Sequence, residues 1–481
     1  MQQDATHPGD PLDSALGVEA LSPEGRKRLL LASEQASAHR IERIRELLIE
    51  NELDAVYIRD LSSIKWVTAF QGVFDDEAAH ALIITPQDAI IHSDSRYGEA
   101  LEAAAQGSQI QVSLERTSHA NWLSHLLAGT SGSKQRAAIE DTLTLREFHM
   151  LTQALADASA SPELVERERF IEGLRVSKDA LEIALMRKAQ AITDAGFAFI
   201  VDFIEPGMTE AQVQRALDNF MLDAGAEGLA FPTIVATGAH AANPHALSGD
   251  TRIACGSAIV MDFGARFGGY CSDMTRTVFV GEPTEKMYRA WEAMRSANEA
   301  AEAELRSGKT GAEIHELAEA VLAEGGFANT MGHGLGHSLG IDIHEDPALS
   351  PRNTKPLPAG AVLTVEPGIY LPAEFGMRLE DFGVVTETGS LKGVALALEG
   401  KSGEMSIVCR ISNEPYQVIY DGADVQQIAN AEKKIPTAWI NEAGNDVTEE
   451  MVRYLRPLIH GSVAVPEQDS MPHYLFLGEA L

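Results

Sequence analysis

The amino-acid sequence predicts an α+β protein with an N-terminal α/β domain, a larger second domain and a C-terminal extension. Three observations support this prediction. Short apolar runs of strand length alternate with helical periodicity over residues 21–172. Over residues 173–393 the strand-like runs come in neighbouring pairs, as in antiparallel hairpins and unlike a βαβ repeat. The residue pattern changes again after Gly389, so residues 394–481 are predicted to be a separate extension.

The first domain is predicted to follow a short tail. Residues 1–20 are rich in Asp, Pro and Gly, which indicates disorder. A helix is predicted from about Ser22 to Glu50, because Ile41, Ile44 and Leu48 fall on one helical face. Three strands follow, the last two joined as a hairpin, at Ala55–Ile58, Ala81–Ile84 and Ala89–His92.

The second domain contains helices with clear start signals. The segments beginning at Thr209 and Thr310 both fit the capping-box pattern, and each predicted helix ends near glycine. A longer amphipathic helix is predicted at Asp179–Phe203. The predicted strands of this domain are Ala258–Ala265, Tyr270–Val280, Ala361–Tyr370 and Met377–Thr386.

The composition excludes several kinds of partner. The chain has 481 residues, with 71 acidic and 38 basic side chains and a formal net charge of -33. Such a surface repels the phosphates of nucleic acids and anionic lipids, so we expect neither a nucleic acid nor a membrane partner. Three cysteines without CxxC spacing indicate a reducing compartment. The sequence shows no signal-peptide pattern and no apolar run of ~18–20 residues, and we therefore expect a cytoplasmic protein.

Two aspartates lie in strand-like segments on either side of a predicted turn. Asp262 belongs to the segment VMDFG and Asp273 to CSDMTRT. A turn over Arg266–Gly269 would place Asp262 directly opposite Asp273 on one face of a hairpin. A single aspartate in a strand would more simply occupy a turn, an edge or a solvated face. Two opposed carboxylates repel each other, and a divalent cation bound between them would offset this repulsion most strongly.

A second hairpin repeats this arrangement. Glu366 lies in TVEPGIY and Glu380 in MRLEDFGVV, and the turn between them is centred near Ala373. This register sets Glu366 opposite Glu380. Two hairpins with opposed carboxylates in one domain indicate a shared metal site and not solvated surface charge.

A glycine-rich segment, HGLGHSLGIDIHE, brings three histidines close together in the sequence: His333, His337 and His344. Its glycines exclude a long regular helix, and its alternating small and apolar residues predict a strand or an extended loop. One such histidine alone would usually be a core residue, but three indicate a functional site. An HExxH motif is absent and cysteine ligands are lacking, so a simple zinc site is not indicated.

The predicted site suits two metal ions. Four carboxylates and one imidazole carry a charge of −4, which two divalent cations would neutralise, as a buried cluster requires. Oxygen-rich ligation favours Mn²⁺ and leaves Co²⁺, Zn²⁺ and Fe²⁺ open. Two metals ~3.5–4 Å apart can bridge one water and lower its pKa towards ~7. The sequence therefore predicts a bridging hydroxide that attacks a carbonyl.

These motifs resemble those of the "pita-bread" metallopeptidases of family M24, which include prolidase (Xaa-Pro dipeptidase), aminopeptidase P, methionine aminopeptidase and the related creatinase. The similarity runs from about Arg40 to Gly389, with the motifs in the family's order. It implies a creatinase-like N-terminal α/β domain at residues 21–172 and a pita-bread catalytic domain at residues 173–393. It also implies Asp262 as a bidentate ligand of one metal, Asp273 and Glu380 as bridging ligands, and His337 and Glu366 as ligands of the other metal.

The resemblance implies catalytic roles for further residues near the metals. His245 resembles the family's substrate-facing histidine, and His333 a pocket histidine near the scissile amide. His344 resembles the histidine that contacts the substrate and shuttles protons. Arg378 is expected on the same strand face as Glu380, where it would steady the anions of the site. Glu380 would also take the proton from the bridging water.

The N-terminal domain narrows the choice within the family. The segments SIKWVTAF and DSRY resemble the creatinase/prolidase N-terminal domain, although Trp66 and Ala69 replace the more usual Tyr and Gly. The resemblance thus implies a homodimer that hydrolyses the peptide bond before proline. Its substrates would be small peptides with proline second, either dipeptides or longer ones, and the compact GHSLGIDIHEDP segment favours the prolidase-like group.

The C-terminal extension departs from the family pattern. Residues 394–481 resemble the C-terminal end of phosphofructokinases, for example in the segment EGKSGEM. Neither a GGD phosphate-binding loop nor a TIDND-like segment occurs, which excludes a kinase interpretation of the whole chain. The extension is therefore interpreted as a fused remnant or a docking module.

Two other functions stay open. The first is a catalytically inactive, peptide-binding pseudoenzyme on the same fold. The second is hydrolysis of small guanidino compounds, as in creatinase, a relative that lacks the metal ligands. The complete ligand set favours the peptidase over both.

Overall fold

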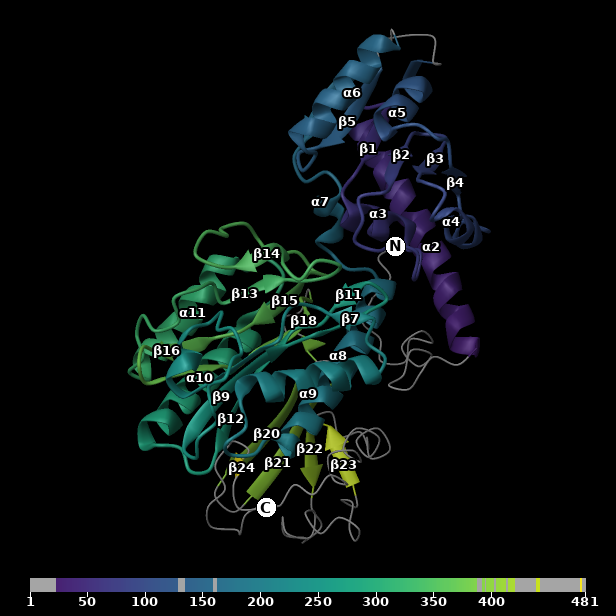
Figure 1. Ribbon diagram of the computed structural model, residues 1–481. Helices are drawn as coiled ribbons and strands as arrows, with labels where there is room; N and C mark the ends of the chain where they lie inside the picture. The colour runs from purple at the N-terminus through teal and green to yellow at the C-terminus, as the bar shows by residue number, and fades with distance from the viewer. Residues whose placement is uncertain are drawn as a thin grey trace. The chain divides into compact units, whose positions relative to one another are not determined.

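A computed structural model describes residues 23–128, 135–158 and 162–386, together with six short strands between residues 392 and 477 (Figure 1). The chain forms two compact units, one with residues 23–175 and 179–181, the other with residues 176–178 and the described residues from 182 onward. The tail predicted at residues 1–20 and most of the extension at 394–481 lie outside the described residues, and the limits of the four predicted domains remain predictions. No helix in the described ranges is long and apolar enough to cross a membrane.

The first unit is built on a six-stranded mixed sheet. Its strands are β1 (Ala55–Ile58), β2 (Ala81–Ile84), β3 (Ala89–His92), β4 (Ile110–Ser113), β5 (Arg136–Glu140) and β6 (Glu163–Arg167). Their order is β4-β3-β2-β1-β5-β6. β2 pairs antiparallel with both β1 and β3, and the other neighbours pair parallel. The three strands predicted from the sequence, and the hairpin between the last two, are confirmed.

Helices cover this sheet because apolar side chains recur on one face of each. The helices are α2 (Pro23–Glu50), α3 (Leu61–Thr68), α4 (Gly98–Ala104), α5 (His119–Ala128), α6 (Leu145–Asp157) and α7 (Glu172–Arg175). The predicted first helix is confirmed by α2, where Ile41, Ile44 and Leu48 are fully buried. Trp122 of α5 and Leu151 of α6 pack with Tyr57 of β1 in the core of the unit.

The second unit has four long helices and a 3₁₀ turn: α8 (Ala180–Phe203), α9 (Glu210–Asp223), η1 (Gly238–Ala242), α10 (Glu285–Glu304) and α11 (Gly311–Glu324). Both predicted capping boxes are present, because Thr209 and Thr310 each accept a hydrogen bond from the backbone three residues later. In turn, the side chains of Gln212 and Glu313 accept hydrogen bonds from the backbone N–H groups of Thr209 and Thr310. The strong start signals therefore place α9 and α11 as expected.

The strands of the second unit form several separate sheets and one two-stranded pair. They are β7 (Gly228–Leu229), β8 (Ile234–Thr237), β9 (Ser257–Phe263), β10 (Ala265–Phe267), β11 (Tyr270–Cys271), β12 (Met274–Val280), β13 (Gly336–Ser338), β14 (Glu345–Leu349), β15 (Val362–Val365), β16 (Gly368–Leu371), β17 (Phe375–Arg378), β18 (Asp381–Val384), β19 (Lys392–Gly393), β20 (Ala395–Lys401), β21 (Glu404–Ile411), β22 (Glu414–Ile419), β23 (Ala438–Asn441) and β24 (Phe476–Leu477). The main sheets have the orders β24-β12-β9-β8 and β14-β13-β15-β18-β19, and β16 pairs with β17. The predicted antiparallel hairpins of an α+β domain are confirmed.

Two hydrophobic clusters hold the helices to these strands. In one, Leu217 of α9 and Ile200 of α8 pack with Phe263 of β9. In the other, Trp291 of α10 and Leu322 of α11 pack with residues of β15 to β17. One helix pair thus covers the β8–β9–β12 strands and the other covers the β15–β17 region (Figure 1). The polar side chains described next come from the strands of both regions.

Candidate metal centre

The first predicted hairpin has a different register from the one expected. Its turn is the two-residue Gly268-Gly269, with φ of +57° and +80°, and not the four residues 266–269. Two positive φ values are typical of a type I′ turn, whose twist matches that of the flanking strands. Asp262 consequently lies opposite Thr275, and the prediction that it directly opposes Asp273 is wrong. Asp273 comes two residues before Thr275, so the two carboxylates are diagonal neighbours.

The second predicted hairpin has the expected register. Val365 pairs with Asp381 on one side and Gly368 pairs with Arg378 on the other, which sets Glu366 opposite Glu380. The turn is centred on Ala373, which has a φ of +64°. This register is confirmed because the ladder keeps the same spacing through Pro367.

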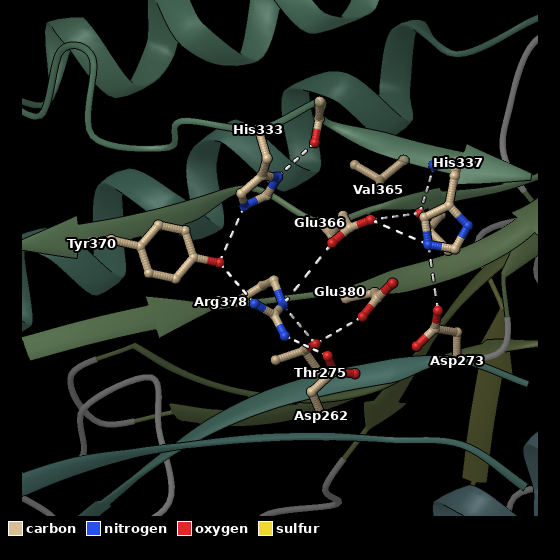
Figure 2. Close-up of polar contacts among 12 residues, drawn as sticks. Asp262, Asp273, Thr275, His333, His337, Val365, Glu366, Tyr370, Arg378 and Glu380 are labelled. Atoms are coloured by element: carbon tan, nitrogen blue, oxygen red, sulfur yellow. Dashed lines mark hydrogen bonds and ion pairs between the residues drawn. The ribbon is translucent and has the colours of Figure 1, made fainter. Parts of the chain in front are cut away.

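Tertiary packing brings the two hairpins and the histidine segment together (Figure 2). One ligand atom each from Asp273, His337 and Glu380 lies within 4.8 Å of the other two. The Nε2 atom of His337 is 3.5 Å from Oδ2 of Asp273 and 3.5 Å from Oε1 of Glu366. The Nδ1 atom of His337 lies 3.1 Å from the carbonyl of Ser338. Because a carbonyl only accepts, Nδ1 carries the proton and the Nε2 lone pair faces the carboxylates.

Arg378 connects the remaining ligand to the group. Its guanidinium donates to Oδ2 of Asp262 at 2.5 Å, to Oγ1 of Thr275 at 2.8 Å and to the hydroxyl of Tyr370 at 2.8 Å. Oγ1 of Thr275 in turn donates to Oε2 of Glu380 at 2.7 Å. Arg378 and Glu380 are both nearly inaccessible to solvent. The arginine is therefore a fixed positive charge beside the carboxylates, as its strand position predicted.

The carboxylates are crowded enough to oppose their own ionisation. Burial, followed by the charges of Glu380 and Asp262, raises the pKa of Asp273 well above its usual range. Burial, followed by the charges of Glu366 and Asp262, does the same to the pKa of Glu380. Burial also raises the pKa of Glu366, against the opposing effect of Arg378. A single arginine thus leaves an excess of negative charge.

The donor set fits divalent cations. Nε2 of His337, whose proton is on Nδ1, lies 3.5 Å from an oxygen of Asp273 and 3.5 Å from an oxygen of Glu366. Oδ1 of Asp262 and Oε1 of Glu380 are buried without a hydrogen-bond partner in the described structure. Buried acceptors without donors are costly unless a cation satisfies them. Oxygen ligands with one imidazole suit Mn²⁺ and similar ions.

The other predicted histidines surround this cluster. Nδ1 of His333 lies 2.7 Å from the carbonyl of Gly334, so Nε2 accepts from the hydroxyl of Tyr370 at 3.1 Å. The ring of His344 packs against that of His337, with centroids 4.5 Å apart. Burial lowers the pKa of His333 and of His344, and the nearby charge of His245 contributes to both shifts. The charge of His245, an exposed residue, thus acts on both of these imidazoles.

Sequence reasoning missed three polar residues of the site: Thr275, Thr364 and Tyr370. Thr364 accepts from the backbone N–H of His337 at 3.0 Å and donates to Glu366 at 3.2 Å. Thr275 and Tyr370 bind Arg378 as described above. Thr275 and Tyr370 lie within the motifs SDMTRT and TVEPGIY, and Thr364 begins the second of these. Their positions next to predicted metal ligands in these motifs could have identified them as residues of the site.

Comparisons with known proteins agree with this geometry. The model of the Creatinase/Prolidase N-terminal domain matches residues 40–177, and the model of Metallopeptidase family M24 matches residues 184–387. The Xaa-Pro dipeptidase of Pyrococcus furiosus is 30% identical over 351 residues, which are 73% of this chain and 96% of that protein. A solved structure of an Xaa-Pro dipeptidase from Bacillus anthracis is 32% identical with a TM-score of 0.67, and that of an X-Pro aminopeptidase from Thermotoga maritima is 32% identical with a TM-score of 0.65. Both similarities cover 73% of this chain and 96% of the solved one.

These matches confirm the predicted creatinase-like N-terminal domain and the pita-bread domain that follows it. The two family models end at residue 387, before the C-terminal extension, whose resemblance to phosphofructokinases remains a prediction. The chain belongs to metallopeptidase family M24.

Proposed function

We propose that this protein is a two-metal Xaa-Pro peptidase, which hydrolyses the bond before proline in dipeptides or at the N-terminus of short peptides. One observation carries the proposal: Nε2 of His337, whose Nδ1 donates to a backbone carbonyl, lies 3.5 Å from Oδ2 of Asp273 and 3.5 Å from Oε1 of Glu366. Such a group needs cations, and the excess of carboxylates over Arg378 suits two. The Xaa-Pro specificity is supported by the names of the similar proteins described above.

The ligands we propose are Asp262 for one metal, His337 and Glu366 for the other, and Asp273 and Glu380 for both. The metals, of which Mn²⁺ is the favoured kind, would polarise the scissile carbonyl and lower the pKa of a water held between them. Oε2 of Glu380 accepts from Thr275, and its Oε1 has no hydrogen-bond partner among the described residues, so this carboxylate suits a metal ligand that would also take the proton of the water. Arg378 fixes Asp262 and keeps the ligand carboxylates in place.

The three histidines would act on the substrate. His333 is held in one tautomer by Gly334 and Tyr370, which orients its ring beside the scissile amide. Because burial lowers the pKa of His344, its neutral form dominates near pH 7; it could accept a proton and then pass that proton to the leaving nitrogen. His245 is exposed and suits contact with an incoming peptide. We also expect a homodimer, by resemblance to the family.

Hydrolysis of Ala-Pro, Gly-Pro and Gly-Pro-Ala, measured with Mn²⁺ and after EDTA treatment, tests this function. We expect activity that chelation abolishes and Mn²⁺ restores, and the dipeptide-to-tripeptide ratio assigns the branch. Asp273→Asn should lose metal and activity, whereas Asp250→Asn, at an exposed loop position, should keep both. Metal retention without hydrolysis would favour the pseudoenzyme, and turnover of guanidino compounds without metal would favour creatinase-like chemistry.

A further inference from the structure

We propose that Glu210 is a positioning residue that holds the His245 loop, residues 237–249, in the shape that presents His245 to the substrate. This inference rests on the proposed function, because it takes His245 as a substrate-facing group. Glu210 is the first residue of α9, and its carboxylate is completely buried. It lies outside the motifs that carry the metal ligands.

The carboxylate of Glu210 joins the two ends of the His245 loop. Oε1 accepts from the backbone N–H of Thr237 at 2.9 Å, and Oε2 accepts from the backbone N–H of Gly249 at 3.1 Å. Between these ends, Nδ1 of His240 donates to the same carboxylate at 2.8 Å. Three donors from 13 residues of chain thus meet on one buried side chain, which closes the loop.

The middle of the loop is held from inside by small apolar contacts. Ala241 and Ala246 are fully buried and pack with Ala236 and Val260 of the neighbouring strands. A Cβ atom at Gly376 of β17 would overlap the carbonyl oxygen of Ala241, so the loop lies directly on that strand. β17 ends at Arg378, so the loop rests on a strand of the metal centre.

His245 depends on this backbone for its position. Its main-chain N–H donates to Oδ1 of Asn243 at 3.2 Å, but within the described part of the chain its imidazole makes no hydrogen bond. The ring is exposed, and Leu247 beside it is 85% exposed. Because no residue of the described ranges hydrogen-bonds this imidazole, its position depends on the backbone of the closed loop. Loosening the carboxylate contact would therefore misplace His245 without removing a metal ligand.

A double-mutant cycle tests this dependence. Glu210→Gln keeps the size and one acceptor of the side chain, but its amide cannot accept from both loop ends. We expect kcat/KM for Gly-Pro to fall by about 10-fold to 100-fold, a range typical of a misplaced catalytic contact, with Mn²⁺ content unchanged. In a His245→Ala background the same change should cost less than about 3-fold, because its effect passes through His245. Equal losses in both backgrounds would overturn the proposal.

A second readout does not depend on activity. Hydrogen exchange of the peptides that cover residues 237–249 should speed up at least about 10-fold in Glu210→Gln. Glu313→Gln is the matched control, since Glu313 is an acidic residue in the first turn of α11, a helix with the same capping box and the same length. It should leave exchange of the loop and kcat/KM unchanged.

The outcomes separate the two proposals. Unchanged exchange in Glu210→Gln overturns the role of Glu210, whether or not the protein is a peptidase. A wild type without Xaa-Pro hydrolysis, or a fully active His245→Ala, overturns the proposed function or the role of His245 in it. Faster exchange with undiminished kcat/KM would also refute the inference, because the loop would then be loosened without consequence.

Discussion

Replacing Arg378 by methionine tests whether this arginine is the charge that stabilises the metal-free site. The change removes a buried cation but keeps most of the side-chain volume. Arg378 binds Asp262 at 2.5 Å, and both side chains are largely buried, with 4% and 14% exposed. Breaking such a pair costs about 3–5 kcal/mol. We expect Arg378→Met to lose about 3 kcal/mol of stability, at the low end of this range. The reason is that Asp273, Glu366 and Glu380 have raised pKa values and can become neutral by taking protons.

Calorimetry of EDTA-treated protein measures this cost. A loss of 1 kcal/mol lowers the unfolding temperature of a unit of this size by about 2–4 °C, so the unfolding temperature of the second unit should fall by about 6–12 °C. Saturating Mn²⁺ should reduce the difference in unfolding temperature between Arg378→Met and the wild type, because the metal ions replace the lost positive charge. Arg306→Met is the control, since Arg306 pairs with Glu304 on the surface at 42% and 45% exposure and should cost less than about 1 kcal/mol. An Arg378→Met transition within about 2 °C of the wild type would refute this account.

Three further predictions concern other parts of the structure. Thr275→Val removes the hydroxyl that links Arg378 to Glu380. We expect its Mn²⁺ affinity, measured by calorimetric titration, to fall about 10-fold to 100-fold, whereas the affinity of Thr275→Ser should stay near that of the wild type. Gly264→Ala should lower the free energy of unfolding by about 1–3 kcal/mol or more, because the new Cβ overlaps the backbone oxygen of Ser272. The control is Gly228→Ala, whose new Cβ meets open space and should cost under about 0.5 kcal/mol. Equal losses of stability in the two variants would contradict the packing argument. Burial raises the pKa of Glu140 to about 7 from 4.5, so its contribution to stability is full below pH 4.5 and is lost as the pH rises towards 7. Relative to wild type, Glu140→Gln should therefore gain up to about 3 kcal/mol in urea unfolding between pH 5 and pH 8, and parallel pH profiles would contradict this.

Local signals in the sequence predicted most elements correctly. The capping boxes at Thr209 and Thr310 and the strand runs at 55–58, 81–84 and 89–92 depend on contacts within a few residues. The hairpin of Glu366 and Glu380 was also predictable, since the ladder needs only one turn to set its register. Such features follow from spacing and turn chemistry, which a sequence displays directly.

The register of the first hairpin shows where this reasoning failed. The segment from Ala265 to Tyr270 allows a four-residue turn or a two-residue Gly-Gly turn, and the two differ by which residue faces Asp262. The strand twist selects the type I′ turn, which needs positive φ at both Gly268 and Gly269. The preference for glycine at these positions was therefore the signal that would have corrected the prediction.

The sequence by itself determined the chemical inventory of the site: four carboxylates, the histidines and an arginine, in the order typical of family M24. Only the tertiary structure decided how they meet. The contacts of Arg378 with Asp262 and Thr275 join residues more than a hundred positions apart, and those of Glu210 depend on a loop that has no periodic pattern. Periodicity and capping report contacts along the chain, whereas the charge balance of a buried site depends on which strands pack face to face.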